Sequence, residues 1–486
     1  MNQEIRKIEP QAVWNKFTDL NAVPRPSKKE EKVRKFMREF GKSLNLETLE
    51  DKIGNVVIKK PATAGMENRK TVVLQSHLDM VTQKNNDVEH DFETQGIEMY
   101  IDGDWVRAKG TTLGADNGLG VAAIMAILES KDIPHPPIEA LFTIDEETGM
   151  TGAKQLDDTI LSGDILLNLD TEEDDEIDIG CAGGIDITAH KNYKEIVPKE
   201  NAQAFLVKLT GLSGGHSGMD IHKGLGNANK LMNRVLYAGN LKTEIQISTI
   251  NGGGLRNAIP RESEAVIVVE NANAEELKNR FEAEIKAVIK EYESLEENLK
   301  IEIEETALPE KVMDAENSKK LLLAIYATHN GVYRMSPDIA DLVETSNNLA
   351  RVEVKNGKIE IQCLTRSSQE TNKQDLTNTL TAVFELSDFE VKTSGEYPGW
   401  QPNPDSEVLK MIDNLYEELH GEKARVVACH AGLECGILLS HYPNMDTVSF
   451  GPTIRGAHSP DERASIASTQ KFWKFLQEVL KNTPEK

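Results

Sequence analysis

Short apolar runs alternate with helix-like segments through the first part of the chain. The run "TVVLQSHLD" (71–79) has the β-branched start of a strand, and "GLGVAAIMAILES" (118–130) has the period and composition of a helix. Two further apolar runs, "PIEALFTID" (137–145) and "DILLNLD" (164–170), are predicted strands. Strands that alternate with helices favour an α/β fold, with a mostly parallel sheet and helices on both of its faces.

The middle of the chain, residues 188–390, has a different pattern. It contains amphipathic strands such as "EAVIVVE" (264–270) and long charged helices such as "AEELKNRFEAEIKAVIKEYESL" (274–295). The α/β pattern then returns. We therefore predict that residues 1–187 and 391–486 form one parallel-sheet domain, into which an α+β domain of residues 188–390 is inserted. The two halves of the insert have a similar succession of strands and helices, which suggests an internal duplication.

The chain is strongly acidic, with 80 Asp and Glu against 55 Lys and Arg and a net charge of −25. This charge disfavours nucleic acid as a partner, because binding to phosphates requires a basic surface. No stretch approaches the roughly 18 uninterrupted apolar residues of a membrane span, and the charged start "MNQEIRKIEPQAVWNKF" does not fit a secretory signal. The four cysteines are scattered without a CxxC pair, so we expect reduced thiols and a cytoplasmic protein.

The predicted strands repeatedly end in residues that bind metals or move protons. The stretch "IEALFTIDEETG" (138–149) ends its apolar run in three consecutive acids. A run of acids is by itself usually a solvated loop. The other strands lead to similar residues, however, and the carboxyl ends of parallel strands meet at one edge of a sheet, where ligands bind. The residues gathered in this way are His77, Asp79, Asp116, Glu146, Glu147, Asp170 and His458.

Two histidines and several carboxylates at one sheet edge suggest a hydrolase with two zinc ions. Zinc binds imidazole nitrogen and carboxylate oxygen, and paired ions need a bridging carboxylate and two further protein ligands each. The set contains no sulfur, so Co2+ or Mn2+ can substitute. The adjacent acids Glu146 and Glu147 can divide two roles, one as an ionised metal ligand and the other as a general base.

At this point the chain resembles a known family, the co-catalytic zinc peptidases of the carboxypeptidase G and aminoacylase kind. The resemblance covers essentially the whole chain, including the order of the ligands and the inserted domain. Three motifs, "TTLGADNGLGVA", "HSGMDIHKGLGNA" and "IRGAHSPDER", are most similar to those of the bacterial aminoacyl-histidine dipeptidases, which cleave Xaa-His and β-Ala-His in the cytosol.

The resemblance implies a role for each residue at the sheet edge. One zinc would be held by His77, Asp116 and Asp170. The other would be held by Asp116, Glu147 and His458, so that Asp116 bridges the two ions.

The same resemblance implies that Glu146 is the general base and that Asp79 orients the imidazole of His77. It also implies a cis peptide bond between Asp116 and Asn117.

The inserted domain resembles the lid of this family. By resemblance, His216 ("SGGHSG") would stabilise the oxyanion, and Asn257 ("LRNAIP") and Arg366 ("TRSS") would bind the C-terminal carboxylate of the substrate. Gly432 ("HAGLECG") would contribute a backbone amide.

We therefore expect a cytosolic metallo-dipeptidase that acts on unblocked dipeptides through a zinc-bridged water. A tripeptidase, a carboxypeptidase and an N-acyl amino acid deacylase are alternatives on the same scaffold. A non-catalytic metal-dependent binding protein is a further alternative, but such a protein has no need of Glu146. The preferred dipeptide stays open at this point. So does the choice between a monomer and a homodimer, and with it the subunit that supplies His216.

Overall fold

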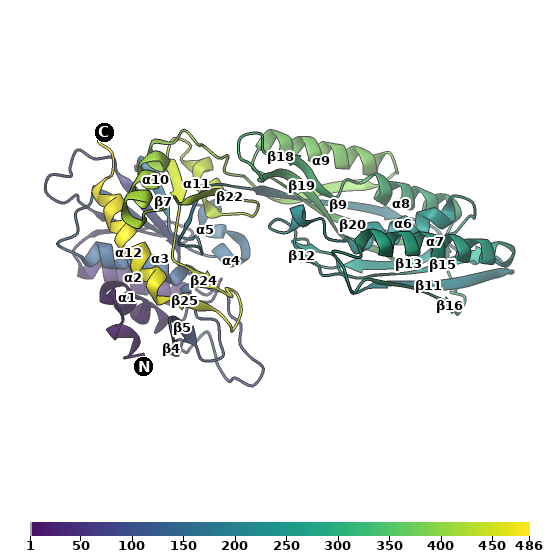
Figure 1. Ribbon diagram of the computed structural model, residues 1–486, viewed down its shortest axis with the longest axis horizontal. Helices are drawn as coiled ribbons and strands as arrows, with labels where there is room; N and C mark the ends of the chain where they lie inside the picture. Colours follow the sequence, from purple (N-terminus) through teal and green to yellow (C-terminus); the bar gives the residue numbers. More distant parts are fainter. Residues whose placement is uncertain (1) are drawn as a thin grey trace. The chain divides into compact units, whose positions relative to one another are not determined.

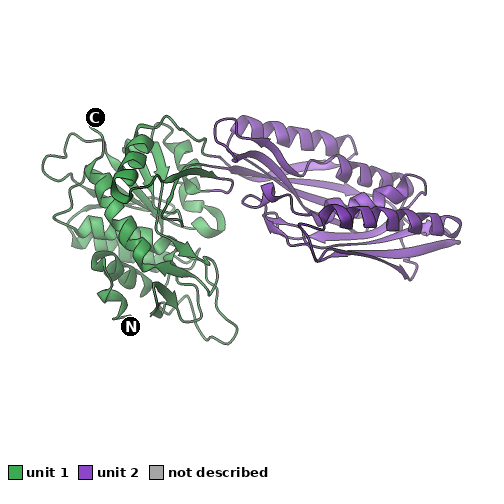
Figure 2. Ribbon diagram, viewed as in Figure 1, with its two compact units in different colours: residues 1–180, 400–428, 433–486 green, residues 181–399, 429–432 purple. Residues whose placement is uncertain are grey.

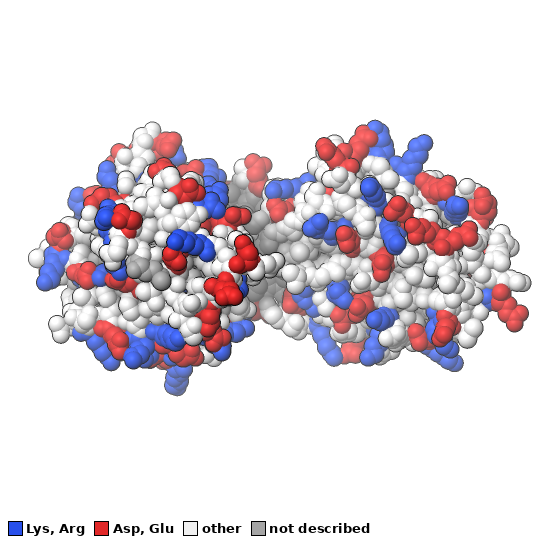
Figure 3. All heavy atoms as spheres, turned by 90° about the horizontal axis from the view of Figure 1, so that it is seen from below, with Lys and Arg blue, Asp and Glu red and all other residues white. Residues whose placement is uncertain are grey.

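The computed structural model describes residues 2–486, which divide into two compact units (Figure 2). Unit 1 consists of residues 1–180, 400–428 and 433–486, and unit 2 of residues 181–399 and 429–432. Among the described residues, no helix is long and apolar enough to cross a membrane. On the face drawn in Figure 3, acidic and basic side chains are interspersed over both units.

The centre of unit 1 is a parallel sheet. Its four central strands lie in the order β6 (Ile138–Thr143), β3 (Val72–His77), β7 (Ile165–Asn168) and β23 (Asp446–Ser449), and each neighbouring pair is parallel. Every residue of β3, β6 and β7 is buried, so both faces of the sheet are covered. The prediction of a mostly parallel α/β sheet is therefore confirmed (Figure 1).

Antiparallel strands extend this sheet on both sides. The full order is β1-β2-β6-β3-β7-β23-β8-β22, in which β1, β2 and β8 pair antiparallel to their inner neighbours. Helix α2 packs on β1 and β2, α3 on β3 and α10 on β23. The bounds of these elements are β1 (Glu47–Glu50), β2 (Val56–Lys60), β8 (Glu176–Cys181), β22 (Arg425–Cys429), α2 (Glu31–Ser43), α3 (Ala115–Glu129) and α10 (Glu407–His420).

The remaining elements of unit 1 include a second sheet and several helices. A separate four-stranded sheet has the order β24-β25-β5-β4. The bounds are β4 (Met99–Asp102), β5 (Trp105–Ala108), β24 (Ile454–Arg455), β25 (Arg463–Ser465), α1 (Gln11–Asn21), α4 (Glu146–Gly149), α5 (Thr151–Lys154), α11 (Glu434–His441) and α12 (Ile466–Lys481).

Unit 2 is a nine-stranded antiparallel sheet with four helices. The strand order is β16-β11-β15-β13-β19-β20-β9-β21, and β18 pairs with β19. Apolar side chains of the strands and of α6 to α9 form one core. The bounds are β9 (Gly183–Asn192), β11 (Ala202–Thr210), α6 (Ala228–Asn240), β13 (Gln246–Gly253), β15 (Ser263–Glu270), α7 (Ala274–Tyr292), β16 (Lys300–Thr306), α8 (Ala315–Ala327), β18 (Gly331–Met335), β19 (Val343–Lys355), β20 (Lys358–Ser367), α9 (Glu370–Glu385) and β21 (Glu390–Tyr397).

The two halves of unit 2 share one topology. The first half runs β11-α6-β13-β15-α7-β16, and the second runs β9-α8-β19-β20-α9-β21, with the first half inserted after β9. In both halves the second strand lies beside the third, the third beside the first and the first beside the fourth. The two second strands, β13 and β19, join the halves. This repeat supports the hypothesis of an internal duplication.

The unit boundaries lie a few residues away from the predicted ones. Strand β9 pairs with β20 from Gly183 onward, so the chain enters unit 2 before residue 188. Strand β9 follows β8 after a single residue, so the sequence gives no break at the boundary between the two units. That unit 1 is a catalytic domain and unit 2 an inserted domain, each able to fold independently, remains our proposal.

Candidate metal centre and substrate-binding residues

The carboxyl ends of the central strands of unit 1 bring the predicted metal ligands together. His77 is the last residue of β3, Asp170 follows β7 by two residues, and Glu147 lies in the turn of α4 after β6. Asp116 lies at the start of α3, and His458 lies in the loop between β24 and β25. Neighbouring parallel strands end at the same edge, so residues far apart in the sequence meet here.

Asp116 lies between the two imidazoles. Its Oδ1 is 3.2 Å from Nε2 of His77, and its Oδ2 is 3.1 Å from Nε2 of His458. The His77 Nε2 also lies 3.5 Å from Oδ1 of Asp170, and the His458 Nε2 lies 3.0 Å from Oε2 of Glu147. The arrangement is therefore two triads of donor atoms that share one carboxylate.

The donor atoms in these triads fit metal ions. Two ligand atoms that are each about 2.0–2.1 Å from a tetrahedral zinc lie roughly 3.3 Å apart, which matches the observed nitrogen–oxygen distances. Oε1 of Glu147 and Oδ1 of Asp170 are buried and have no hydrogen-bond partner among the described residues. Buried charged oxygens of this kind are costly unless a cation or a donor compensates them. The geometry therefore supports a dinuclear metal site.

The crowding of carboxylates also shifts the pKa values in the site. Burial lowers the pKa of His77, but the charge of Asp170 and the contacts with Asp116 and Asp79 outweigh burial and hold it well above its usual value. Contacts with Asp116 and Glu147 raise the pKa of His458 to about 11. Both imidazoles are thus held in a strongly negative environment, which equally favours a bound cation.

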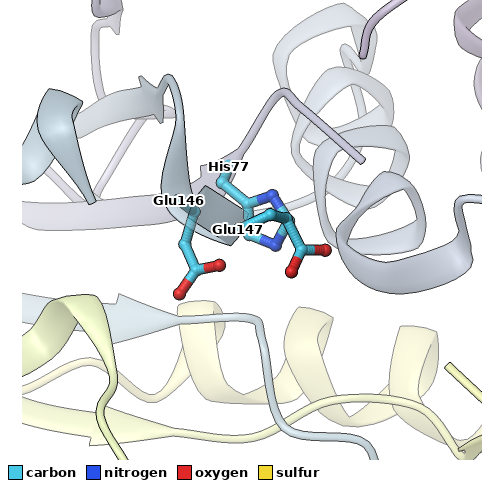
Figure 4. A group of neighbouring side chains, drawn as sticks. All are labelled: His77, Glu146 and Glu147. Atoms are coloured by element: carbon cyan, nitrogen blue, oxygen red, sulfur yellow. The ribbon is translucent and has the colours of Figure 1, made fainter. Parts of the chain in front are cut away.

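Glu146 and Glu147 leave the same turn in different directions (Figure 4). The sequence interpretation placed them at a strand end, but they form the first residues of α4, so helical rotation separates their side chains. The Glu147 carboxylate points toward the second triad. Burial, followed by the charges of neighbouring carboxylates, raises the pKa of Glu146 well above its usual value. A carboxyl that holds a proton this readily suits general acid–base chemistry.

Asp79 connects the Glu146 turn to the first histidine. Its Oδ1 lies 3.4 Å from Nδ1 of His77, and its two oxygens accept hydrogen bonds from the backbone N–H groups of Glu146 and Glu147 at 3.0 and 3.3 Å. Ser27 donates a further hydrogen bond at 2.8 Å. One buried carboxylate therefore accepts from the turn that carries the two glutamates and lies within ion-pair distance of the His77 imidazole.

The peptide bond between Asp116 and Asn117 is cis, as the resemblance implied. The Asn117 side chain donates a hydrogen bond at 2.6 Å to the carbonyl of Leu169, next to Asp170. This bond connects the start of α3 to the end of β7.

Of the four residues predicted to contact the substrate, His216 and Arg366 lie in a defined polar environment in unit 2. Nδ1 of His216 accepts hydrogen bonds from the backbone N–H groups of Gly218 and Met219, so a neutral ring carries its proton on Nε2. Burial and the charge of Arg366 lower the pKa of His216 to about 4. At neutral pH His216 is therefore an uncharged ring whose Nε2–H is able to donate a hydrogen bond.

Arg366 is a buried cation with no carboxylate within ion-pair distance among the described residues. It is 4% exposed, and its guanidinium donates to the hydroxyl groups of Tyr397, at 2.8 Å, and Ser217, at 3.4 Å. The carbonyl of Asn257 accepts from the N–H of Ser217, but the Asn257 side chain is exposed. Gly432 lies just before α11, in the short segment assigned to unit 2.

Sequence reasoning missed several buried charged residues around the metal ligands. Glu434, at the start of α11, accepts hydrogen bonds from Gln75 at 2.7 Å and Thr143 at 2.6 Å, and burial raises its pKa to about 8. Arg25 and Glu462 are also almost fully buried. In the sequence these three residues look like ordinary charged loop or helix-start residues, and only the fold shows that they are buried.

A row of buried polar side chains crosses the sheet beneath the ligands. Asn168 donates to Gln75 and accepts from Ser449, both at 2.5 Å, and Ser449 lies 2.8 Å from the hydroxyl of Thr171. Thr171 in turn contacts Asp178 on β8 at 2.8 Å. The row connects the ends of four strands, including those that lead to His77 and Asp170.

Comparisons with known proteins agree with this geometry. Residues 73–482 match the sequence profile of the peptidase family M20/M25/M40. The chain is 42% identical over 484 residues to the cytosol non-specific dipeptidase of Escherichia coli strain K12, which covers 99% of this chain and 100% of that protein.

Solved structures give the same result for the fold. The aminoacylhistidine dipeptidase from Vibrio alginolyticus has a TM-score of 0.94 and 42% identity, and the match covers 100% of this chain and 99% of that one. The aminopeptidase PepT from Bacillus cereus has a TM-score of 0.57 at 16% identity, with 98% of both chains covered, which is a likeness of fold alone.

Proposed function

The chain belongs to the peptidase family M20/M25/M40, and on this premise we propose that it is a cytosolic metal-dependent dipeptidase. Two relatives that match it end to end at 42% identity are dipeptidases by name, one described as non-specific and one as an aminoacylhistidine dipeptidase. We propose that its substrates are unblocked dipeptides, including Xaa-His and β-Ala-His. The observation that carries the proposal is the shared carboxylate of Asp116 between two histidines, with a buried Glu146 beside them.

We propose two zinc ions as the cofactors, with Co2+ or Mn2+ as substitutes. His77 and Asp170 would hold one ion, Glu147 and His458 the other, and Asp116 both. When bound, the ions supply a Lewis acid for the scissile carbonyl and lower the pKa of water at the site.

In this proposal Glu146 moves the proton. Its carboxylate takes a proton from the attacking water and gives it to the leaving amine, so that one residue serves as base and then as acid. Its raised pKa supports this role, because a carboxylate with a low pKa is too weak a base to take a proton from water. Asp79 would keep the Nδ1 proton of His77 in place and leave Nε2 free as a ligand.

We further propose that unit 2 supplies the residues that recognise the substrate. Arg366 would form a bidentate pair with the C-terminal carboxylate, assisted by Asn257 and the backbone amide of Gly432. Nε2–H of His216 would donate to the oxyanion. Among the described residues no carboxylate lies within ion-pair distance of Arg366, and this supports its role, as the neutral state of His216 supports that of His216.

The test is hydrolysis of a peptide panel by protein that has been stripped with a chelator and then reloaded. The panel contains β-Ala-His, Gly-His, other dipeptides, tripeptides and N-acetyl amino acids. We expect dipeptides to be cleaved only after metal is restored. Cleavage of tripeptides, C-terminally extended peptides or acetylated amino acids in place of dipeptides would retain the metal site but reject the dipeptidase assignment.

A further inference from the structure

The carboxylate of Glu462 lies inside a ring of four consecutive backbone N–H groups. Its Oε2 accepts from Leu113 at 2.7 Å and from Gly114 at 2.9 Å. Its Oε1 accepts from Ala115 at 2.7 Å and from Asp116 at 3.2 Å. The side chain is 2% exposed, and burial raises its pKa to about 7, while the backbone N–H donors act in the opposite direction by favouring the ionised carboxylate. Glu462 therefore fixes the backbone that leads into Asp116.

Arg25 holds the same region from the other side. It is 1% exposed and donates to the carbonyls of Leu78, at 3.2 Å, Asp79, at 3.0 Å, and Gly114, at 2.5 Å. A fourth hydrogen bond at 3.1 Å reaches the side chain of Asn21. Burial lowers the pKa of Arg25 only to about 10, so the guanidinium remains charged at neutral pH. One cation thus connects the end of β3, just past His77, to the start of α3.

Two glycines of the motif "LGADNG" leave room for this guanidinium. A Cβ at Gly114 would lie 2.5 Å from Nη2 of Arg25, and a Cβ at Gly118 would lie 2.6 Å from the same atom. Gly114 also has a φ of 69°. The backbone on both sides of Asp116 is therefore closely fitted to Arg25.

We infer that Arg25 and Glu462 are positioning residues that hold the shared carboxylate of Asp116 between the two imidazoles and thereby couple the two metal sites. Gly114 gives its N–H to Glu462 and its carbonyl to Arg25. Arg25 also binds the end of the strand that carries His77, through the carbonyl of Leu78, and Glu462 lies in the same loop as His458. Each metal triad thus has one histidine anchored to the same short segment. The inference rests on the proposed function for its metal and for its turnover readout.

The test is Glu462→Gln, which keeps the shape but replaces one accepting oxygen by an N–H2 group facing two N–H donors. We expect zinc affinity, measured by competition with a chromophoric chelator on stripped protein, to fall roughly 10–100-fold. At saturating zinc, kcat should fall while KM stays within about twofold, because no substrate contact is removed. Asp461→Asn is the matched control: Asp461 is an exposed neighbour that pairs with Arg107, and its loss should leave zinc affinity unchanged.

Arg25→Lys provides the second arm and carries the test if Glu462→Gln does not fold. Lysine keeps the charge but has three N–H donors on a single nitrogen, so it cannot replace the four hydrogen bonds that two nitrogens of Arg25 make. Zinc affinity should therefore fall by a similar factor. Because both residues act through Gly114, the double variant should lose less affinity than the two factors multiplied together. A folded Glu462→Gln or Arg25→Lys protein with wild-type zinc affinity overturns the inference, even if it is less stable to unfolding. Zinc binding is measured without substrate, so a failed dipeptidase assignment would not affect this result.

Discussion

The position of Asp116 between two imidazoles has a direct consequence at the scale of the residue. Each of its oxygens serves a different triad, whereas Asp170 and Glu147 each belong to one. Asp116→Asn should therefore weaken the binding of both ions. The amide that replaces the carboxylate has only one uncharged oxygen as a ligand, and its N–H2 group does not bind a cation. Asp170→Asn should weaken the binding of only the ion beside His77. Zinc counted by elemental analysis after dialysis should fall to near zero in the first variant and to about one per chain in the second. Equal losses in both variants would contradict a shared carboxylate.

Glu146 gives a second prediction at this scale. Glu146→Gln removes the carboxylate that we propose takes up the proton and leaves all five proposed metal ligands in place. We expect kcat for Gly-His to fall by roughly 10²–10⁴ while the zinc content is unchanged. Glu173→Gln, which removes a carboxylate paired with Arg455 outside the site, is the control and should retain activity. A Glu146→Gln protein with full metal and full turnover would exclude Glu146 as the base.

At the scale of the element, the row of polar side chains makes strand β8 sensitive to pH. Burial raises the pKa of Asp178 from 3.8 to about 7. In the unfolded chain the same group ionises near 3.8, so between these values the folded state binds more protons and the free energy of unfolding falls as pH rises. The loss is complete above the folded pKa and amounts to at most roughly 4 kcal/mol.

Asp178→Asn should abolish this trend, because the amide is uncharged at every pH and its oxygen can still accept from the Thr171 hydroxyl. Relative to the wild type, the variant should gain stability steadily from pH 4 to about pH 7 in urea unfolding. Asp175→Asn is the control and should have the opposite effect. Arg425 lowers the pKa of Asp175, so the ionised carboxylate stabilises the fold above its unfolded pKa. Its replacement should therefore reduce stability at neutral pH. Parallel pH profiles for wild type and Asp178→Asn would refute the buried titration.

The elements also show what the sequence could and could not predict. Buried parallel strands are continuous apolar runs, so β3, β6 and β7 were recognisable, and with them the edge where His77 and Asp170 meet. The roles within the site came from resemblance. Arg25 and Glu462 could not be found, because a charged side chain in a loop is normally exposed, and their burial depends on contacts with segments many residues away.

At the scale of the whole molecule, metal binding and the proposed substrate recognition belong to different units. All five proposed ligands lie in unit 1, and Arg366 lies in unit 2. Arg366→Lys should therefore raise KM for dipeptides roughly 10–100-fold, through the loss of a bidentate charged pair, and leave zinc affinity unchanged. Arg351→Lys, at a partly exposed pair with Glu353 in the same sheet, is the control. An unchanged KM would remove Arg366 from the substrate site.

The loop between β24 and β25 also has a consequence for how the active molecule is made. It contributes His458 and Glu462, whereas their partners Arg25, His77 and Asp116 come from the first quarter of the chain. A chain whose translation stops before this loop has most of the peptidase sequence but lacks the second histidine and the carboxylate that braces Asp116. If His458 is a ligand as proposed, we expect such a fragment to be inactive. Peptide hydrolysis would then require a chain translated past His458, so a growing chain short of that loop would not cleave peptides on the ribosome.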